Sequence, residues 1–129
     1  MNANELEHWL EVAKHDADTA KLIIDNNGHA DIGIYHIHQA VEKLLKAIFV
    51  FDNKNPPKIH HLDQLLNMLI DRHTQLIDIS KDIITVDSYL PKLRYPVSEK
   101  LDDSDLLKCW TSFNAIQNAL MIIITNKKR

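Results

Sequence analysis

Apolar side chains recur at every third or fourth position through most of the chain, the spacing that lines one face of an α-helix. The pattern is clearest in segments 4–26 and 31–51, and in a last segment that starts at residue 103 or 104 and ends near residue 125. Segments 61–72 and 79–92 repeat it over fewer turns. β-Branched residues in segment 79–92 also suit a strand, but they do not alternate as strand residues do. The pattern therefore predicts five helices, more than about 60% helix in total, and no sheet.

Turn-forming residues separate these segments. The Asn-Asn-Gly turn at 26–28 tolerates the left-handed backbone that ends many helices, and loop 52–57 finishes with two prolines. Pro91 and Pro96 predict a break or kink near the end of the fourth helix. Because the connections are short, consecutive helices should pack antiparallel. We expect one domain over residues 1–129, an all-α antiparallel up-down bundle of four to five helices.

Polar residues mark where the helices are expected to start. Asn4 precedes the first apolar repeat, and Glu7 follows three residues later in the spacing of a capping box. Asp103 or Ser104 can cap the last helix. Gly33, near the start of the second helix, costs about 1 kcal/mol of helix propensity.

Composition and charge narrow the class of protein. The chain has 129 residues and a formal net charge of −3, so no overall basic field attracts nucleic acid. Its one cysteine, Cys109, cannot form an intramolecular disulfide and falls in an apolar helical stretch, as a core residue would. No N-terminal apolar run resembles a signal peptide, and the apolar-rich stretch 119–125 is far shorter than the ~20 residues of a membrane span. A cytoplasmic protein that does not enter a membrane is therefore expected.

Segment 35–47 carries the strongest local motif. An aromatic residue is followed by a Gln-Ala-x-Glu-Lys-x-x-Lys-Ala pattern, formed here by Gln39, Ala40, Glu42, Lys43, Lys46 and Ala47. This pattern resembles the second helix of the HEPN family of helical-bundle domains. Where many members of that family have a second glutamine, this chain has His38.

Three other segments resemble the same family, in the family's order. The residues that match its first-helix pattern are Trp9, Ala13, Asp16 and Ala20. Segment 58–62, Lys-Ile-His-His-Leu, is similar to its basic-Thr-His-x-Leu step, with Ile59 in place of the threonine. Tyr89, followed by Leu-Arg-Tyr-Pro at 93–96, resembles its Arg-Tyr-Pro ending. The resemblance covers about residues 9–96, and an amphipathic helix follows it.

The resemblance implies a non-catalytic module that binds a nucleotide or nucleic acid, or that serves as the partner subunit of a minimal nucleotidyltransferase in a toxin–antitoxin-like pair. The chain has no nucleotidyltransferase signature, so that enzyme would be a separate protein. The resemblance also implies a homodimer, with the first or the last helix supplying the contact. The expected ligand-binding face consists of Tyr35, Gln39, Lys43, Lys46, His60 and Arg94. On this face, Lys43 and Lys46 are expected to meet phosphates.

A purely structural explanation of the same motif stays open. Glu42 and Lys46 are four residues apart in the favourable order for a surface ion pair worth about 0.2–0.5 kcal/mol. Gln39 and Lys43 lie on an adjacent line of the helix. A solvated polar face then accounts for all four residues without a ligand, and the protein would be a structural dimerisation bundle.

Catalysis is not favoured by the sequence. Active ribonucleases of the family use an arginine followed, after four to six intervening residues, by a histidine that can move a proton while the arginine holds the phosphate. Here Arg72 is followed directly by His73, no histidine follows Arg94, and Arg129 is terminal. The sequence therefore leaves open whether the protein is an enzyme, and it favours a protein without catalytic activity. The alternative is a divergent ribonuclease toxin that uses His60 with Arg94.

No metal or other cofactor is expected. His36 and His38 are two residues apart, which on a regular helix points them about 200° apart, so they cannot share one ion. His38 and Glu42 are four apart and can face the same ion, but two ligands rarely make a site.

Overall fold

The computed structural model describes residues 2–95 and 100–126, of which 79% are helical, with no strand. The α-helices are α1 (Ala3–Asp25), α2 (Ala30–Phe51), α3 (Leu62–Leu69), α4 (Ser80–Asp87), α5 (Leu90–Arg94) and α6 (Asp103–Thr125). A short 3₁₀ helix, η1 (Thr74–Ile79), links α3 to α4. The expected all-α helical bundle is confirmed.

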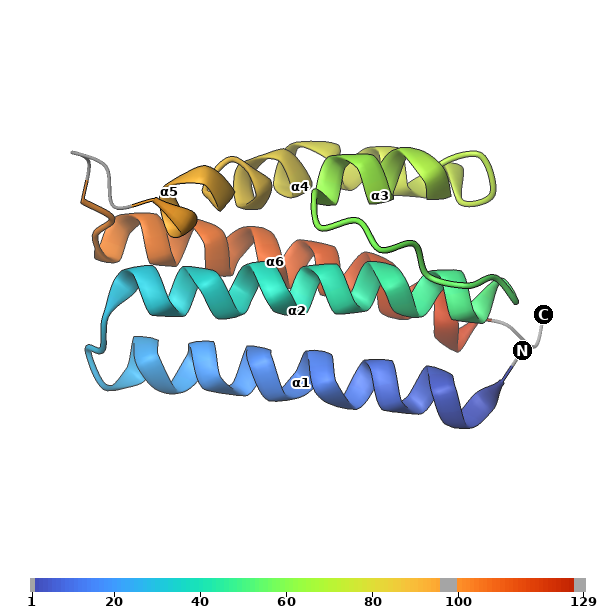
Figure 1. Cartoon of the computed structure of the whole chain (residues 1–129), viewed down its shortest axis with the longest axis horizontal. Helices are drawn as coiled ribbons and strands as arrows, with labels where there is room; N and C mark the ends of the chain where they lie inside the picture. Colours follow the sequence, from blue (N-terminus) through green and yellow to red (C-terminus); the bar gives the residue numbers. More distant parts are fainter. Residues whose placement is uncertain (1, 96–99, 127–129) are drawn as a thin grey trace.

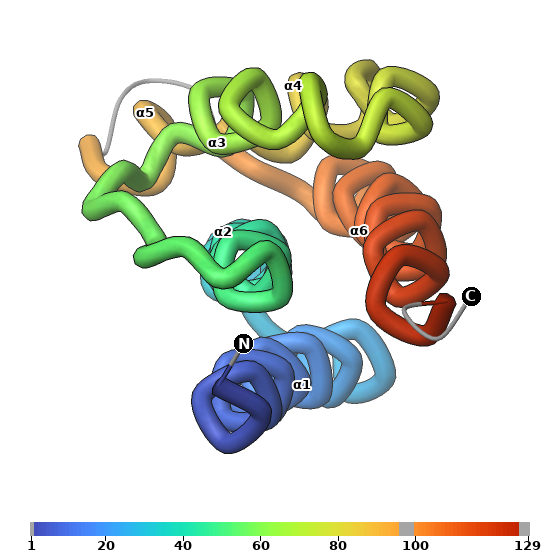
Figure 2. Tube along the Cα trace, turned by 90° about the vertical axis from the view of Figure 1, so that its right-hand side faces the viewer, coloured from blue at the N-terminus to red at the C-terminus, as the bar shows by residue number. Residues whose placement is uncertain are grey.

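Helix α2 lies at the centre of the bundle. In Figure 1 it runs antiparallel to α1 below it, and Figure 2 shows α6 beside it and the α3–α5 segment above it. The connection after α2 differs from a simple up-and-down path, because it runs back along α2 before α3 begins, so α3 points the same way as α2 (Figure 1). Most residues of α2 are buried, as expected of the central helix of a bundle.

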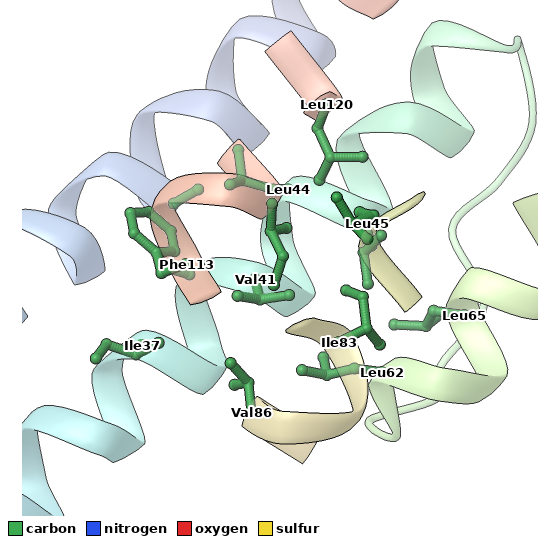
Figure 3. Close-up of a cluster of buried hydrophobic side chains, with 14 of the residues drawn as sticks. Ile37, Val41, Leu44, Leu45, Leu62, Leu65, Ile83, Val86, Phe113 and Leu120 are labelled. Atoms are coloured by element: carbon green, nitrogen blue, oxygen red, sulfur yellow. The ribbon is translucent and has the colours of Figure 1, made fainter. Parts of the chain in front are cut away.

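The core forms where four helices turn their apolar faces towards one another (Figure 3). Each helix contributes side chains at the three- and four-residue spacing that the sequence shows. They are Ile37, Val41, Leu44 and Leu45 from α2, Leu62 and Leu65 from α3, Ile83 and Val86 from α4, and Phe113 and Leu120 from α6. Burial of this set is the main stabilising term of the fold.

The fourth predicted helix, 79–92, is in fact two helices, because α4 ends at Asp87 and α5 begins at Leu90. Pro91 lies in the first turn of α5, where its missing N–H breaks no helical hydrogen bond. The expected break therefore falls before Pro91 rather than at it. The second predicted break, at Pro96, lies outside the described residues.

Two predicted helix caps were wrong by one or two residues. The Oδ1 atom of Asn2, and not the side chain of Asn4, accepts a hydrogen bond from the backbone N–H of Glu5 at 3.1 Å. Asn2 and Glu5 have the same three-residue spacing as the predicted pair, so the sequence allows either register. At α6 the cap is Asp102, which forms a reciprocal capping box with Asp105.

Close packing of α2 against α6 explains why a glycine occupies position 33. A Cβ atom there would lie 2.6 Å from Cδ1 of Leu106 on α6 and 3.3 Å from Cγ2 of Ile23 on α1. The helical glycine therefore permits three helices to approach one another at this end of the bundle. At the nearby turn, Asn27 adopts the expected left-handed conformation with φ 53°. Within the described residues, no helix is both long enough and apolar enough to span a bilayer.

Candidate functional site

A polar cleft opens between α2, α5 and the loop that precedes α3. Its volume is about 300 Å³, which is at the lower end of the range for small-molecule sites. The lining residues are Tyr35, His38, Gln39 and Glu42 from α2, His60 from the loop, and Leu90, Leu93 and Arg94 from α5. The four α2 residues recur at three- and four-residue steps, so one helical face supplies this side of the cleft.

Four of the six residues predicted to form the site line this cleft: Tyr35, Gln39, His60 and Arg94. The two predicted lysines do not. The Nζ atom of Lys43 donates to Asp16 on α1 at 2.5 Å, on another side of α2. The Nζ atom of Lys46 is buried and donates to Glu42 at 2.9 Å. Both ammonium groups are therefore engaged with carboxylates of the protein.

The mouth of the cleft carries an aromatic ring and a guanidinium group. Tyr35 is 46% exposed, and its ring meets the edge of His36 at a centroid distance of 5.3 Å. Arg94 is exposed, and within the described part of the chain its guanidinium makes no hydrogen bond or ion pair. An exposed aromatic face can stack on a flat ring, and a guanidinium can grip a phosphate with two parallel hydrogen bonds.

Glu42 forms one part of the buried floor. Its Oε2 atom accepts hydrogen bonds from Nζ of Lys46 at 2.9 Å and from Nδ1 of His60 at 3.1 Å. Its Oε1 atom is buried and has no hydrogen-bond partner in residues 2–95 and 100–126. Glu42 is 6% exposed and Lys46 is 7% exposed. The prediction of a solvated surface pair was therefore wrong for these two residues, because α3 to α5 cover this face of α2.

His38 forms the other part of the floor and is 1% exposed. Its Nε2 atom lies 3.2 Å from Oδ1 of Asp87 on α4. A carboxylate can only accept, so Nε2 donates to Asp87, and in the neutral form of the ring Nδ1 then carries the lone pair. That Nδ1 atom is buried and, within the part of the chain that the structure describes, has no hydrogen-bond partner.

Asp87 connects three elements behind the cleft and was not singled out from the sequence. Its Oδ1 atom also accepts from the backbone N–H of Leu62, the first residue of α3, at 2.9 Å. Its Oδ2 atom lies 3.4 Å from Nδ1 of His61. Burial alone raises the pKa of Asp87, but the hydrogen bonds from His38, Leu62 and His61 outweigh burial and lower the pKa to about 2. No local pattern signals this role, because all three partners lie at least 25 residues away in the chain.

The histidines of α2 lie on opposite sides of the helix, as predicted from their spacing. The Nδ1 atom of His36 pairs with Asp16 on α1 at 2.8 Å, whereas His38 faces Asp87 on α4. Beside the cleft, His61, Asp63 and Asp87 each offer a ligand atom within 4.8 Å of the others. An imidazole and two carboxylates can bind a divalent ion. Among the described residues, this is the one group of three such side chains whose ligand atoms lie that close together.

The geometry defines a helical bundle with a polar cleft built on its central helix. A model of the HEPN domain family matches residues 6–123 of the 129-residue chain. The protein therefore belongs to the HEPN domain family. No curated protein and no solved structure matches the chain.

Proposed function

We propose that the protein is a binding module whose cleft takes a nucleotide. The observation that carries this proposal is the convergence of Tyr35, Gln39, His60 and Arg94 from three separate segments on one cleft. These residues supply an aromatic face, an amide, an imidazole and a guanidinium, the groups that hold the ring and phosphate of a nucleotide. The buried polar floor adds hydrogen-bonding groups that an apolar pocket would lack.

A single nucleotide suits the charges better than a long nucleic acid. The net charge is −3, and Lys43 and Lys46 are held by Asp16 and Glu42. Arg94 is the cation at the mouth that has no carboxylate partner among the described residues. Tight binding of a polyanion requires several phosphate contacts, whereas one or two contacts suffice to orient a nucleotide.

Isothermal titration calorimetry with nucleotides in low-salt buffer tests the proposal. We expect binding that weakens as salt is added, and Arg94→Ala should weaken it about tenfold or more because the guanidinium contact is lost. Lys21→Ala is the matched control, because Lys21 is a cation on α1 that pairs with Asp25 at 2.5 Å, away from the cleft. Equal affinities for the two variants, or no binding by the wild-type protein, would contradict the proposal.

A second candidate function is RNA cleavage, which one contact supports. His60 is 60% exposed and is oriented by Glu42, so a carboxylate–imidazole pair lies in the same cleft as Arg94. The missing arginine–histidine spacing favours binding without cleavage, because acid–base catalysis by a placed histidine is worth ~10²–10⁴-fold in rate. We expect no RNA cleavage above a buffer control. Cleavage that persists through purification and disappears in His60→Ala would establish the ribonuclease instead.

We also propose that the protein assembles as a homodimer through the groove between α1 and α6. The groove has a volume of about 410 Å³ and is mostly apolar, with Leu10, Trp110, Phe113 and Met121 among its lining residues. Trp110 is partly exposed and stacks on the buried ring of Phe113 at a centroid distance of 5.2 Å, which holds the indole at the groove. Light scattering at micromolar concentration should give twice 14.9 kDa, and Trp110→Asp should restore the monomer. A wild-type monomer at that concentration would contradict this assembly.

The association with a separate minimal nucleotidyltransferase is a further part of the proposal, supported by the family resemblance alone. Co-expression of the protein with a nucleotidyltransferase encoded beside it should yield a complex on size exclusion. If no complex forms and no nucleotide binds, the purely structural bundle is the function that remains.

A further inference from the structure

Two buried side-chain atoms of residues that line the cleft have no hydrogen-bond partner among the described residues. They are Nδ1 of His38 and Oε1 of Glu42. No other buried side-chain nitrogen or oxygen atom of the described residues lacks a partner. Both residues are more than nine-tenths buried, both line the cleft, and they lie one turn apart on α2. Folded proteins pair nearly all such atoms, so an unpaired set gathered at one cleft points to a ligand.

Oε1 of Glu42 is an acceptor, and Nδ1 of His38 is one when the ring is neutral. The carboxylate of Glu42 has no proton to donate, and its other oxygen is already taken by Lys46 and His60. In neutral His38 the proton is on Nε2, which faces Asp87, so Nδ1 presents a lone pair. The glutamine that many family members carry in place of His38 would offer both a donor and an acceptor. With His38 neutral, the two unpartnered atoms of the cleft floor are therefore both acceptors.

We propose that the cleft selects guanine among the nucleobases, an inference that rests on the proposed nucleotide binding. Guanine carries two neighbouring donor groups, the ring N1–H and the exocyclic N2 amine. Adenine and cytosine each place a ring acceptor beside their single amine, and uracil places its one N–H between two carbonyls. Those acceptors would face the lone pairs of Glu42 and His38, which is unfavourable in a buried site.

The rest of the cleft agrees with a guanine nucleotide. The side chains above the floor are the exposed ones, Tyr35, His60 and Arg94, so a base can reach the floor by rotamer changes at the surface. Tyr35 then stacks on the base and Arg94 binds the phosphate. A volume of about 300 Å³ admits a single nucleotide rather than a folded polymer.

Calorimetry with guanosine, adenosine and inosine monophosphates tests the selectivity on the wild-type protein. We expect the guanine nucleotide to bind about tenfold or more tightly than the adenine nucleotide. The inosine nucleotide keeps the N1–H and lacks the amine, so its affinity should lie between the other two. Equal affinities for guanine and adenine nucleotides would overturn the selectivity and leave the proposed nucleotide binding intact. Failure of every nucleotide to bind would overturn both.

Two variants then locate the source of the selectivity. Glu42→Gln and His38→Gln each replace an acceptor with a group that also donates, so each should reduce the preference for guanine several-fold. Asp52→Asn is the matched control, because the Asp52 side chain is only 7% exposed and its carboxylate pairs with His73 at 2.8 Å outside the cleft. Circular dichroism establishes that each variant is folded. A preference that survives in both folded variants would overturn the inference, and if neither folds, the inosine comparison on the wild-type protein decides it.

Discussion

Replacing Asp87 with asparagine should destabilise the fold in a way that depends on pH. The change keeps the shape of the side chain but removes the charge that holds His38, His61 and the first N–H of α3. In the folded protein the pKa of Asp87 is lowered from 3.8 to about 2. A shift of that size corresponds to roughly 2.5 kcal/mol of stabilisation, because each pKa unit is worth 1.36 kcal/mol. The carboxyl keeps partial access to water, which screens its interactions, so we expect a loss of about 1–2 kcal/mol at pH 7.

The sign of the pH dependence follows from the lowered pKa. The stabilisation is fully present above the unfolded pKa of 3.8 and is lost as the pH falls through the folded pKa of about 2. At pH 3 about half of it should remain, because the unfolded carboxyl is already mostly protonated while the folded one is not. The difference in stability between wild type and Asp87→Asn should therefore shrink between pH 4 and pH 2.

Urea unfolding at pH 7, 4 and 3, followed by tryptophan fluorescence, measures this difference. Asp78→Asn is the matched control, because Asp78 is exposed on η1 and its change should stay within about 0.5 kcal/mol of wild type. A destabilisation by Asp87→Asn that is the same at pH 7 and pH 3 would refute the argument from charge. So would an effect no larger than that of Asp78→Asn.

Three further predictions concern the packing. Gly33→Ala gains about 1 kcal/mol of helix propensity but forces its Cβ against Leu106, a cost of about 1–3 kcal/mol, so thermal unfolding should show a variant no more stable than wild type. Leu45→Ala removes a fully buried side chain and should cost about 2–5 kcal/mol in urea unfolding, so a loss below 1 kcal/mol would contradict the core assignment. Burial, aided by the charge of Asp105, raises the pKa of Cys109 to about 12, so at pH 8 the native thiol should react with Ellman's reagent at least about 100-fold more slowly than in urea.

The helices were predictable because each apolar stripe is a local pattern. The three long helices differ from the predicted segments by about one residue at each end, and the turn at 26–28 ends α1 as its composition indicates. The errors fall where two registers compete, as between Asn2 and Asn4, or where a proline suits a helix start as well as a break, as at Pro91. The return of the chain along α2 before α3 has no local signal, because loop length alone does not fix its direction.

The cleft was predictable only in part. Motif spacing placed Tyr35 and Gln39 on one face of α2, and the resemblance added His60 and Arg94 from distant segments. The partners of Lys43 and Lys46 depend instead on which neighbouring helix packs against each face of α2. A sequence shows that a lysine and a glutamate are four residues apart, but not that other helices will bury them.

Burial of most of α2 gives its polar residues a structural role that the sequence leaves open. A polar side chain on a covered helix must find a partner in a neighbouring element, because water cannot supply one. His36 and Lys43 find Asp16 on α1, and His38 finds Asp87 on α4. These side-chain pairs, on two opposite sides of α2, fix the rotation of the helix about its own axis. The two atoms that this arrangement leaves without partners both belong to residues of the remaining face, where the cleft lies. The paired residues of the motif therefore hold the helix in place, and its two unpaired atoms belong to residues that line the cleft, where the proposed nucleotide would supply their missing partners.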